Sequence, residues 1–144
     1  MPATCDNSVM LKLVRFLAAV FCALSLAACG GVDSPSNATA EDFSGTLTPL
    51  GQANRAFSAS KTGELQVTLQ SLTPRPVVGF VGIALGTPVG TDCSPALNYI
   101  ISQAAIGQQY SLGQIQKGSY CILIADSNAI LTTDTSFTIH FLHP

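Results

Sequence analysis

The 144-residue chain is poor in charge and contains no tryptophan. Lys and Arg together number 6, Asp and Glu number 8, and the formal net charge at pH 7 is −2. Proteins that bind nucleic acid need a basic face to neutralise phosphates, so we expect no nucleic-acid partner. Disordered chains combine low hydrophobicity with high net charge. The hydrophobic fraction of 47% excludes that class for the chain as a whole.

The sequence also lacks an apolar run long enough to span a bilayer. The longest run, Phe16–Ala28, is shorter than the roughly 20 residues that a membrane-spanning helix needs. Lys12 and Arg15 precede it. A basic region followed by a short apolar segment and small residues is typical of a secretory signal. We therefore predict a signal peptide over residues 1–28; a buried core helix or an uncleaved anchor is the alternative.

The end of this run, Leu26-Ala27-Ala28-Cys29, resembles the lipobox of bacterial lipoproteins. In that family the Cys sulfur receives a diacylglyceryl group and the signal is cut just before it. The resemblance implies that Cys29 is lipidated and anchors the protein to a membrane of the cell envelope. In proteobacterial lipoproteins, an Asp directly after the lipidated Cys favours retention in the inner membrane. This chain has Gly30 there, which favours the outer membrane. An ordinary signal followed by a chance Cys is the alternative, and both Met1 and Met10 remain candidate translation starts.

Residues 29–42 and 43–144 differ sharply in pattern. After Cys29 the chain is small and polar up to Asp42, with no periodic apolar residues, which is typical of a flexible tether. From Phe43 onward apolar and polar residues alternate, which predicts β-strands. We therefore predict one domain over residues 43–144.

Seven segments of this domain have the pattern of strands. The clearest are Leu65–Leu69, Val81–Leu85 and Phe137–Phe141, and the unbroken apolar run Tyr120–Ala125 is typical of a central strand. Three shorter candidates are Gly45–Leu50, Arg55–Ala59 and Gln109–Ile115. Turn signals are expected between the strands at Thr62-Gly63, Pro74-Arg75-Pro76, Gly86-Thr87-Pro88, Lys117-Gly118 and Asp126-Ser127-Asn128. The spacing predicts an all-β fold, a single antiparallel β-sandwich.

Residues 96–106 fit a different pattern. Ser94-Pro95 can begin a helix and Gly107 can end it. Apolar residues at helical spacing lie between them: Leu97, Ile100, Ile101, Ala104 and Ala105. We predict a short helix over 96–106, with a strand over Leu97–Ser102 as the alternative.

The cysteine count predicts one disulfide. Cys5 and Cys22 fall in the signal and Cys29 in the lipobox, which leaves Cys93 and Cys121 in the domain. A single remaining pair in an exported domain favours a disulfide. Closing that loop is worth about 3.6 kcal/mol in the chain-entropy model.

The domain resembles the bacterial pre-peptidase C-terminal domain, a jelly-roll-like β-sandwich. The resemblance rests on Ser44-Gly45-Thr46-Leu47, Phe57-Ser58-Ala59, Thr62–Leu69, Lys117–Ile122 and Phe137-Thr138-Ile139. Many members have an acidic strand where this chain has Gly79–Leu85. That departure weakens the carbohydrate-facing or calcium-facing role that the family implies.

Candidate catalytic and metal-binding residues are few. No G-x-S-x-G nucleophile elbow or P-loop is present. His140 and His143 lie three residues apart, so on an extended strand they point to opposite faces and do not form a metal site. We expect both to be exposed surface histidines. Asp92, Asp126 and Asp134 are expected to cap loops rather than bind calcium. We therefore predict no enzyme, no cofactor and no metal.

The remaining candidate surface is neutral and rich in amides. It comprises Gln66, Thr68, Gln70, Gln103, Gln108, Gln109, Gln114 and Gln116. Such a surface suits a glycan or protein partner, and it is also the ordinary solvated side of an exported sheet. The sequence thus predicts a non-catalytic envelope lipoprotein with an interaction or structural module. The alternative is a carbohydrate- or calcium-binding accessory module of the same fold.

Overall fold

The computed structural model describes residues 37–76 and 80–144. The predicted signal, Cys29 and most of the predicted tether lie outside these residues. The described part is built from strands and contains no α-helix. Its eight strands are β1 (Thr39–Leu47), β2 (Gln52–Ala59), β3 (Gly63–Thr73), β4 (Val81–Val89), β5 (Asp92–Ala104), β6 (Gln109–Ile115), β7 (Gly118–Ala125) and β8 (Thr135–His143).

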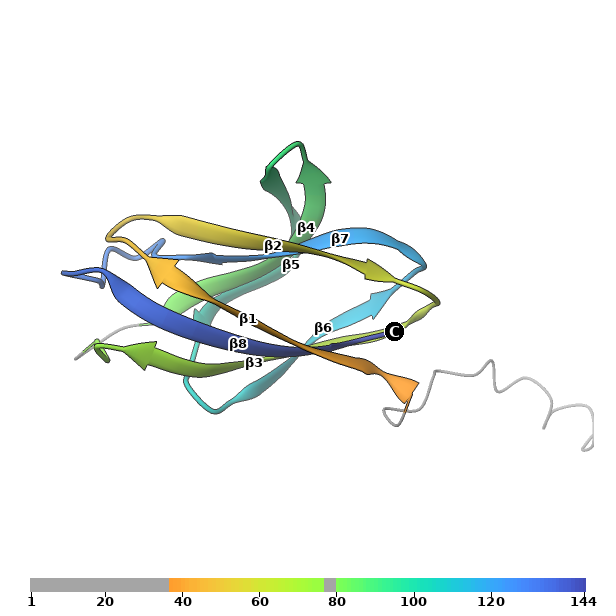
Figure 1. Cartoon of the computed structure of the whole chain (residues 1–144), viewed down its shortest axis with the longest axis horizontal. Helices are drawn as coiled ribbons and strands as arrows, with labels where there is room; N and C mark the ends of the chain where they lie inside the picture. The colour runs from red at the N-terminus through yellow and green to blue at the C-terminus, as the bar shows by residue number, and fades with distance from the viewer. Residues whose placement is uncertain (1–36, 77–79) are drawn as a thin grey trace, which may run out of the picture. The chain divides into compact units, whose positions relative to one another are not determined.

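The strands form two four-stranded antiparallel sheets that pack as a sandwich (Figure 1). Sheet A has the order β1-β8-β3-β6 and sheet B the order β2-β7-β4-β5. Every connection except the β4–β5 hairpin passes from one sheet to the other. This is the arrangement of an eight-stranded jelly roll, so the predicted all-β sandwich is confirmed.

Alternation along the strands builds the core between the sheets. Leu65, Val67 and Leu69 of β3 are fully buried, and Gln66 and Thr68 between them point outward. The same period brings inward the apolar residues Val81, Ile83, Leu85, Ile122, Ile124, Phe137, Ile139 and Phe141. Cys121 to Ile124 are buried in succession because β7 is an inner strand of its sheet, as the unbroken apolar run predicted.

All seven predicted segments fall on strands, and all but Gly45–Leu50 lie wholly within them. Strand β1 begins at Thr39 and ends at Leu47, whereas the prediction was Gly45–Leu50. Residues 39–42, expected in the tether, therefore belong to the sheet and pair with residues 140–143 of β8. The start of β1 could not be recognised from apolar alternation, because Thr39 to Asp42 pair along the sheet edge through backbone groups. Such pairing needs no apolar side chains.

The predicted helix over 96–106 is wrong. Residues 92–104 form β5, the edge strand of sheet B, whose Ile100 and Ile101 lie opposite Ala84 and Ile83. The register shifts between the pairs Ala84–Ile100 and Gly86–Pro95. This bulge breaks the period of two and leaves Leu97 and Ile100 exposed, so the apolar spacing imitates a helix.

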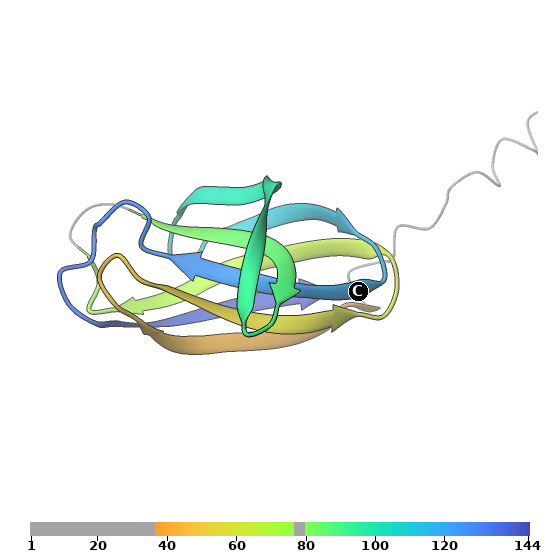
Figure 2. The ribbon, with the colours of Figure 1, turned by 90° about the horizontal axis from the view of Figure 1, so that it is seen from above.

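The β4–β5 hairpin rises out of sheet B, and Figure 2 shows it crossing over the neighbouring strands. Its two-residue turn is Gly90-Thr91, with Gly90 at φ 62°, as a type II′ hairpin turn requires. The expected turn at Gly86-Thr87-Pro88 is therefore wrong, because those residues continue β4.

The predicted disulfide is confirmed and holds this hairpin in place. Cys93 and Cys121 are bonded, with their Cα atoms 5.9 Å apart. Cys121 lies beside Gly86 in the sheet, so the bond joins the hairpin to the inner strand β7. With Ala84 and Leu123, the two cysteines form a second small buried cluster on the outer side of sheet B.

Candidate functional site

The outer face of sheet A carries two rows of hydroxyl side chains. In each row a residue of β1 lies beside one of β8, which lies beside one of β3. We call these six residues the hydroxyl rows: Ser44, Thr138 and Ser71 in the first, and Thr46, Ser136 and Thr73 in the second. All six are at least partly exposed, and none is ionisable. The array is a neutral set of hydrogen-bond donors and acceptors.

The side chains of this face are partly paired with one another. The hydroxyls of Ser44 and Thr138 lie 3.0 Å apart. Beyond the first row, His140 Nδ1 lies 2.7 Å from Asp42 Oδ1. The amide of Gln109 donates to Gln66 on the neighbouring strand. Cross-strand pairs of this kind stabilise the sheet and also fix the orientation of the polar groups on this face.

The predicted amide-rich surface is only partly assembled. The outer face of sheet A brings together Gln66, Thr68, Gln109 and Gln114. Gln70 lies at a bulge of β3, Gln103 on β5 in the other sheet, and Gln108 and Gln116 at the two ends of β6. The hydroxyl rows were not predicted from the sequence. The signal is the hydroxyl residues at every second position of β1 and β8, which are Ser44 and Thr46, and Ser136 and Thr138.

The two histidines differ in environment, and the expectation that both are exposed is wrong for His143. His140 is on the outer face, while His143 is 4% exposed. Its ring centroid lies 4.9 Å from that of Phe57 and 5.6 Å from that of Phe141. Strand β8 keeps its alternation to its last residue, and the Ser60 N–H donates to the Pro144 carbonyl. The chain end is therefore held against the sandwich, and this closure buries His143.

An ionic cluster closes the side of the sandwich formed by β1 and β2. Glu41 Oε2 lies 3.0 Å from a guanidinium nitrogen of Arg55, and its Oε1 lies 3.1 Å from His143 Nε2. Glu41 belongs to sheet A and Arg55 to sheet B, so the carboxylate bridges the two layers. No sequence pattern predicts this cluster, because its members are far apart along the chain.

Asp126 has the loop-capping role that the sequence predicted. Its side chain is 1% exposed and accepts hydrogen bonds from the backbone N–H groups of Leu50, Ile130 and Leu131. Burial raises the pKa of this carboxyl, but the three N–H donors outweigh burial and the pKa lies below its usual value. Asp126 therefore fixes its own loop against the β1–β2 loop. Asp92 and Asp134 are exposed in the hairpin and in the β7–β8 loop.

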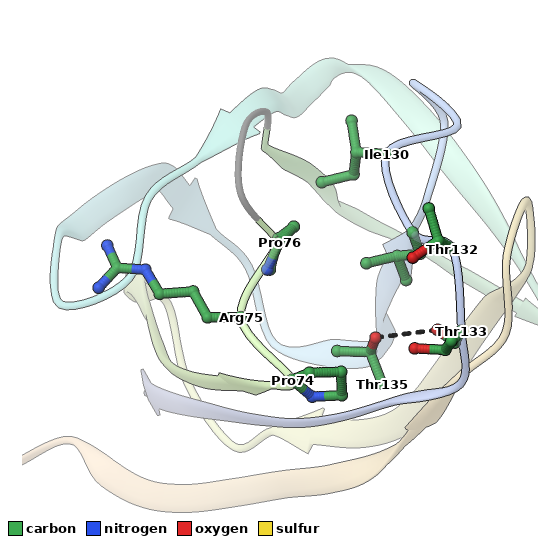
Figure 3. A pocket seen from close by; sticks show the side chains of 8 residues that line it. Pro74, Arg75, Pro76, Ile130, Thr132, Thr133 and Thr135 are labelled. Carbon is green, nitrogen blue, oxygen red and sulfur yellow. Dashed lines mark hydrogen bonds between the residues drawn. The ribbon is translucent and has the colours of Figure 1, made fainter.

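A pocket of about 240 Å³ lies beside the chain that leaves β3 (Figure 3). Its lining residues are Pro74, Arg75, Pro76, Ile130, Leu131, Thr132, Thr133 and Thr135. The Arg75 side chain extends away from the threonines, and Thr135 Oγ1 donates to the Thr133 carbonyl. Arg75 is the single ionisable group in this lining, so the pocket holds no pair of groups for acid–base chemistry.

Metal-ligating residues do not gather in the described part of the chain. Across residues 37–76 and 80–144, no three His, Cys, Asp or Glu side chains lie close enough to hold a metal ion. The calcium-binding alternative therefore has no ligand cluster in this part. The same residues include no helix long and apolar enough to cross a membrane.

No family model and no curated protein matches this chain. Among solved structures, it is similar to the periplasmic inhibitor of g-type lysozyme PliG from Aeromonas hydrophila. The two share 13% sequence identity with a TM-score of 0.45, and the match covers 78% of this chain and 91% of that one.

Proposed function

We propose that this protein is an exported, lipid-anchored component of the bacterial cell envelope. In this proposal residues 1–28 are its signal and Cys29 carries the lipid. A short tether then leads to a non-catalytic β-sandwich interaction module. The observation that carries export is the Cys93–Cys121 disulfide, because such bonds persist in oxidising compartments. The jelly-roll order of the strands supports the resemblance to the pre-peptidase C-terminal domain, which remains part of the proposal.

The ionisable groups of the described sites are engaged in contacts within the fold, which supports a binding role. Asp126 uses its oxygens on three backbone donors, and His143 is enclosed by Glu41 and two aromatic rings. His140 is oriented by Asp42 on the exposed face. These ionisable groups hold the fold together, so binding through the uncharged hydroxyl rows of sheet A is the activity that the geometry favours.

Cell fractionation tests the anchor. The full chain is expressed in a Gram-negative host, and the wild-type protein is expected in the membrane fraction. Cys29→Ser removes the acceptor sulfur and is expected to release the protein into the soluble periplasmic fraction or to leave its signal uncut. Cys22→Ala is the matched control, because it changes a Cys of the predicted signal and keeps the lipobox. Membrane association of Cys29→Ser after signal removal, or reduced Cys93 and Cys121 in a cytoplasmic fraction, would overturn the proposal.

The hydroxyl rows favour a finer function, the binding of a neutral glycan. A polyhydroxyl ligand exchanges hydrogen bonds with such an array, and no charge in either row needs a counterion. Strand spacing of about 4.8 Å places the hydroxyls at intervals that several groups of one sugar chain can reach together.

Titration calorimetry with a panel of neutral oligosaccharides tests this function. The double variant Thr46→Val with Ser136→Ala removes two exposed hydroxyls from one row. We expect a loss of affinity of about tenfold, since each neutral hydrogen bond is worth about 0.5–1.5 kcal/mol. Thr87→Val with Ser58→Ala makes the same exchange on sheet B and is expected to leave affinity unchanged. Absence of binding to every oligosaccharide, or equal losses in both variants, would refute it.

A further inference from the structure

The two open sides of the sandwich differ in charge. On the side formed by β1 and β2, Glu41 pairs with Arg55 and Asp42 lies beside His140. Charged side chains of this kind keep sheet edges from pairing with other chains. The opposite side is formed by the edge strands β5 and β6, and the segment from Cys93 to Gln116 contains no charged residue. This side therefore lacks the electrostatic protection of the other.

Two large apolar side chains are exposed on β5. Leu97 is 87% exposed and Ile100 48% exposed. Leu97 lies in the bulge, where one residue of β4 opposes several of β5, and Ile100 borders it. Exposing the apolar surface of a protruding leucine to water is unfavourable. Burial of that side chain against a second surface would therefore be favourable.

A groove of about 320 Å³ lies next to these side chains, between β5 and β6. It is lined by Asn98, Tyr99, Ile100, Ile101, Ser111, Leu112 and Gly113. The Tyr99 ring packs beside Gly113, where a Cβ would come within 3.3 Å of it and where φ is +86°. Farther along β5, the Tyr110 hydroxyl accepts from the Ala105 N–H and donates to the Gln103 carbonyl. Tyr110 thus covers that end of the edge, and the groove and Leu97 occupy the other.

We propose that two copies of this chain associate through the β5–β6 side, with Leu97 of each copy seated in the groove of the other. The protruding side chain and the groove adjoin one another on the same strand, so one two-fold axis satisfies both contacts. In such a symmetric contact a charge close to the axis would meet its own copy. The segment from Cys93 to Gln116 has no charge that could be placed against its own copy, so it is compatible with that symmetry.

Sedimentation equilibrium on the full-length chain, extracted in detergent, measures this association. A contact confined to one strand edge is expected to bury less than the roughly 1,000 Å² of a stable interface. We therefore expect a dimer that dissociates on dilution. Leu97→Lys places like charges across the axis and is expected to raise the dissociation constant at least about tenfold. Leu50→Lys changes another exposed leucine, 74% exposed in the β1–β2 loop, and is expected to leave the dimer intact.

A charge-swap experiment separates association from any effect on folding. Leu97→Lys and Leu97→Glu are each expected to be monomeric when alone, and a mixture of the two is expected to form a heterodimer because opposite charges then meet. A wild-type protein that stays monomeric up to roughly 200 μM, or variants at Leu97 and Leu50 with equal effects, would overturn the proposal. Monomeric protein that still fractionates with membranes would leave the lipid anchor standing, so the two proposals fail separately.

Discussion

At the scale of single residues, the ionisable side chains of this domain serve its architecture. Asp126 joins two loops, and Glu41 joins the two sheets through Arg55 and also contacts His143 of its own sheet. A buried carboxylate is tolerated only when donors replace the water it loses, and Asp126 has three such donors. These contacts make the carboxylates measurable determinants of stability.

Asp126→Asn is expected to lower the free energy of unfolding by about 2–4 kcal/mol. The amide that replaces one carboxylate oxygen cannot accept, so buried N–H groups of the two loops lose their partner, and hydrogen bonds to charged groups are worth about 1.5–3 kcal/mol. Urea denaturation of the full chain measures the change. Asp134→Asn, at an exposed position in the same loop, is the control and is expected to stay within about 0.5 kcal/mol of wild type. Equal losses in the two variants would contradict this role of Asp126.

The contribution of Asp126 is expected to vanish in acid. Its pKa in the folded protein is lowered, whereas the unfolded value is about 3.9. The unfolded chain therefore takes up the proton first as pH falls, and stability is lost between the unfolded pKa and the lower folded one. Denaturation curves from about pH 6 to about pH 2.5 should show wild type and Asp126→Asn converging below about pH 4. A difference that stays constant over this range would show that the charge is not responsible.

At the scale of elements, the β4–β5 hairpin depends on close approach of its strands. A Cβ at Gly86 would collide with the Ser94 carbonyl oxygen and lie 2.9 Å from Cys93 Sγ. Glycine at this position lets the hairpin curl over β7 and brings Cys93 to Cys121. The hairpin and the disulfide are therefore one structural unit.

Gly86→Ala is expected to lower the free energy of unfolding by about 1–3 kcal/mol, because the added methyl group meets backbone that cannot move aside. Gly82→Ala in the same strand is the control: its Cβ would approach the Ser127 hydroxyl at 3.2 Å, and that side chain can rotate. Thermal denaturation with the disulfide intact gives the comparison. A Gly86→Ala protein as stable as Gly82→Ala would show that the close packing of the hairpin is unimportant.

The elements also show which features a sequence can predict. Period-two alternation identified β3, β4 and β8 because one face of each strand is buried, and cysteine counting identified the disulfide. The pattern of strand β5 predicts a helix because a bulge spaces its apolar residues irregularly. The buried His143 and the cluster around Glu41 could not be predicted, since they depend on which distant strands become neighbours.

At the scale of the whole molecule, the sandwich presents three different surfaces. The outer face of sheet A offers neutral hydroxyls, the β1–β2 side is ionic, and the β5–β6 side is uncharged with an exposed leucine. In the proposed lipoprotein, the tether would hold the domain beside a membrane. Its neutral face would then bind a ligand, and its uncharged side would bind a second copy.

The central claim, an exported protein anchored by a lipid on Cys29, is tested most directly by mass spectrometry of the mature N-terminal peptide. The protein is purified from the membranes of a Gram-negative host that expresses the full chain. The account predicts a first residue of Cys29 that carries the added mass of a diacylglyceryl group, with residues 1–28 removed. A mature chain that retains residues 10–28, or that begins elsewhere with an unmodified Cys29, would contradict it.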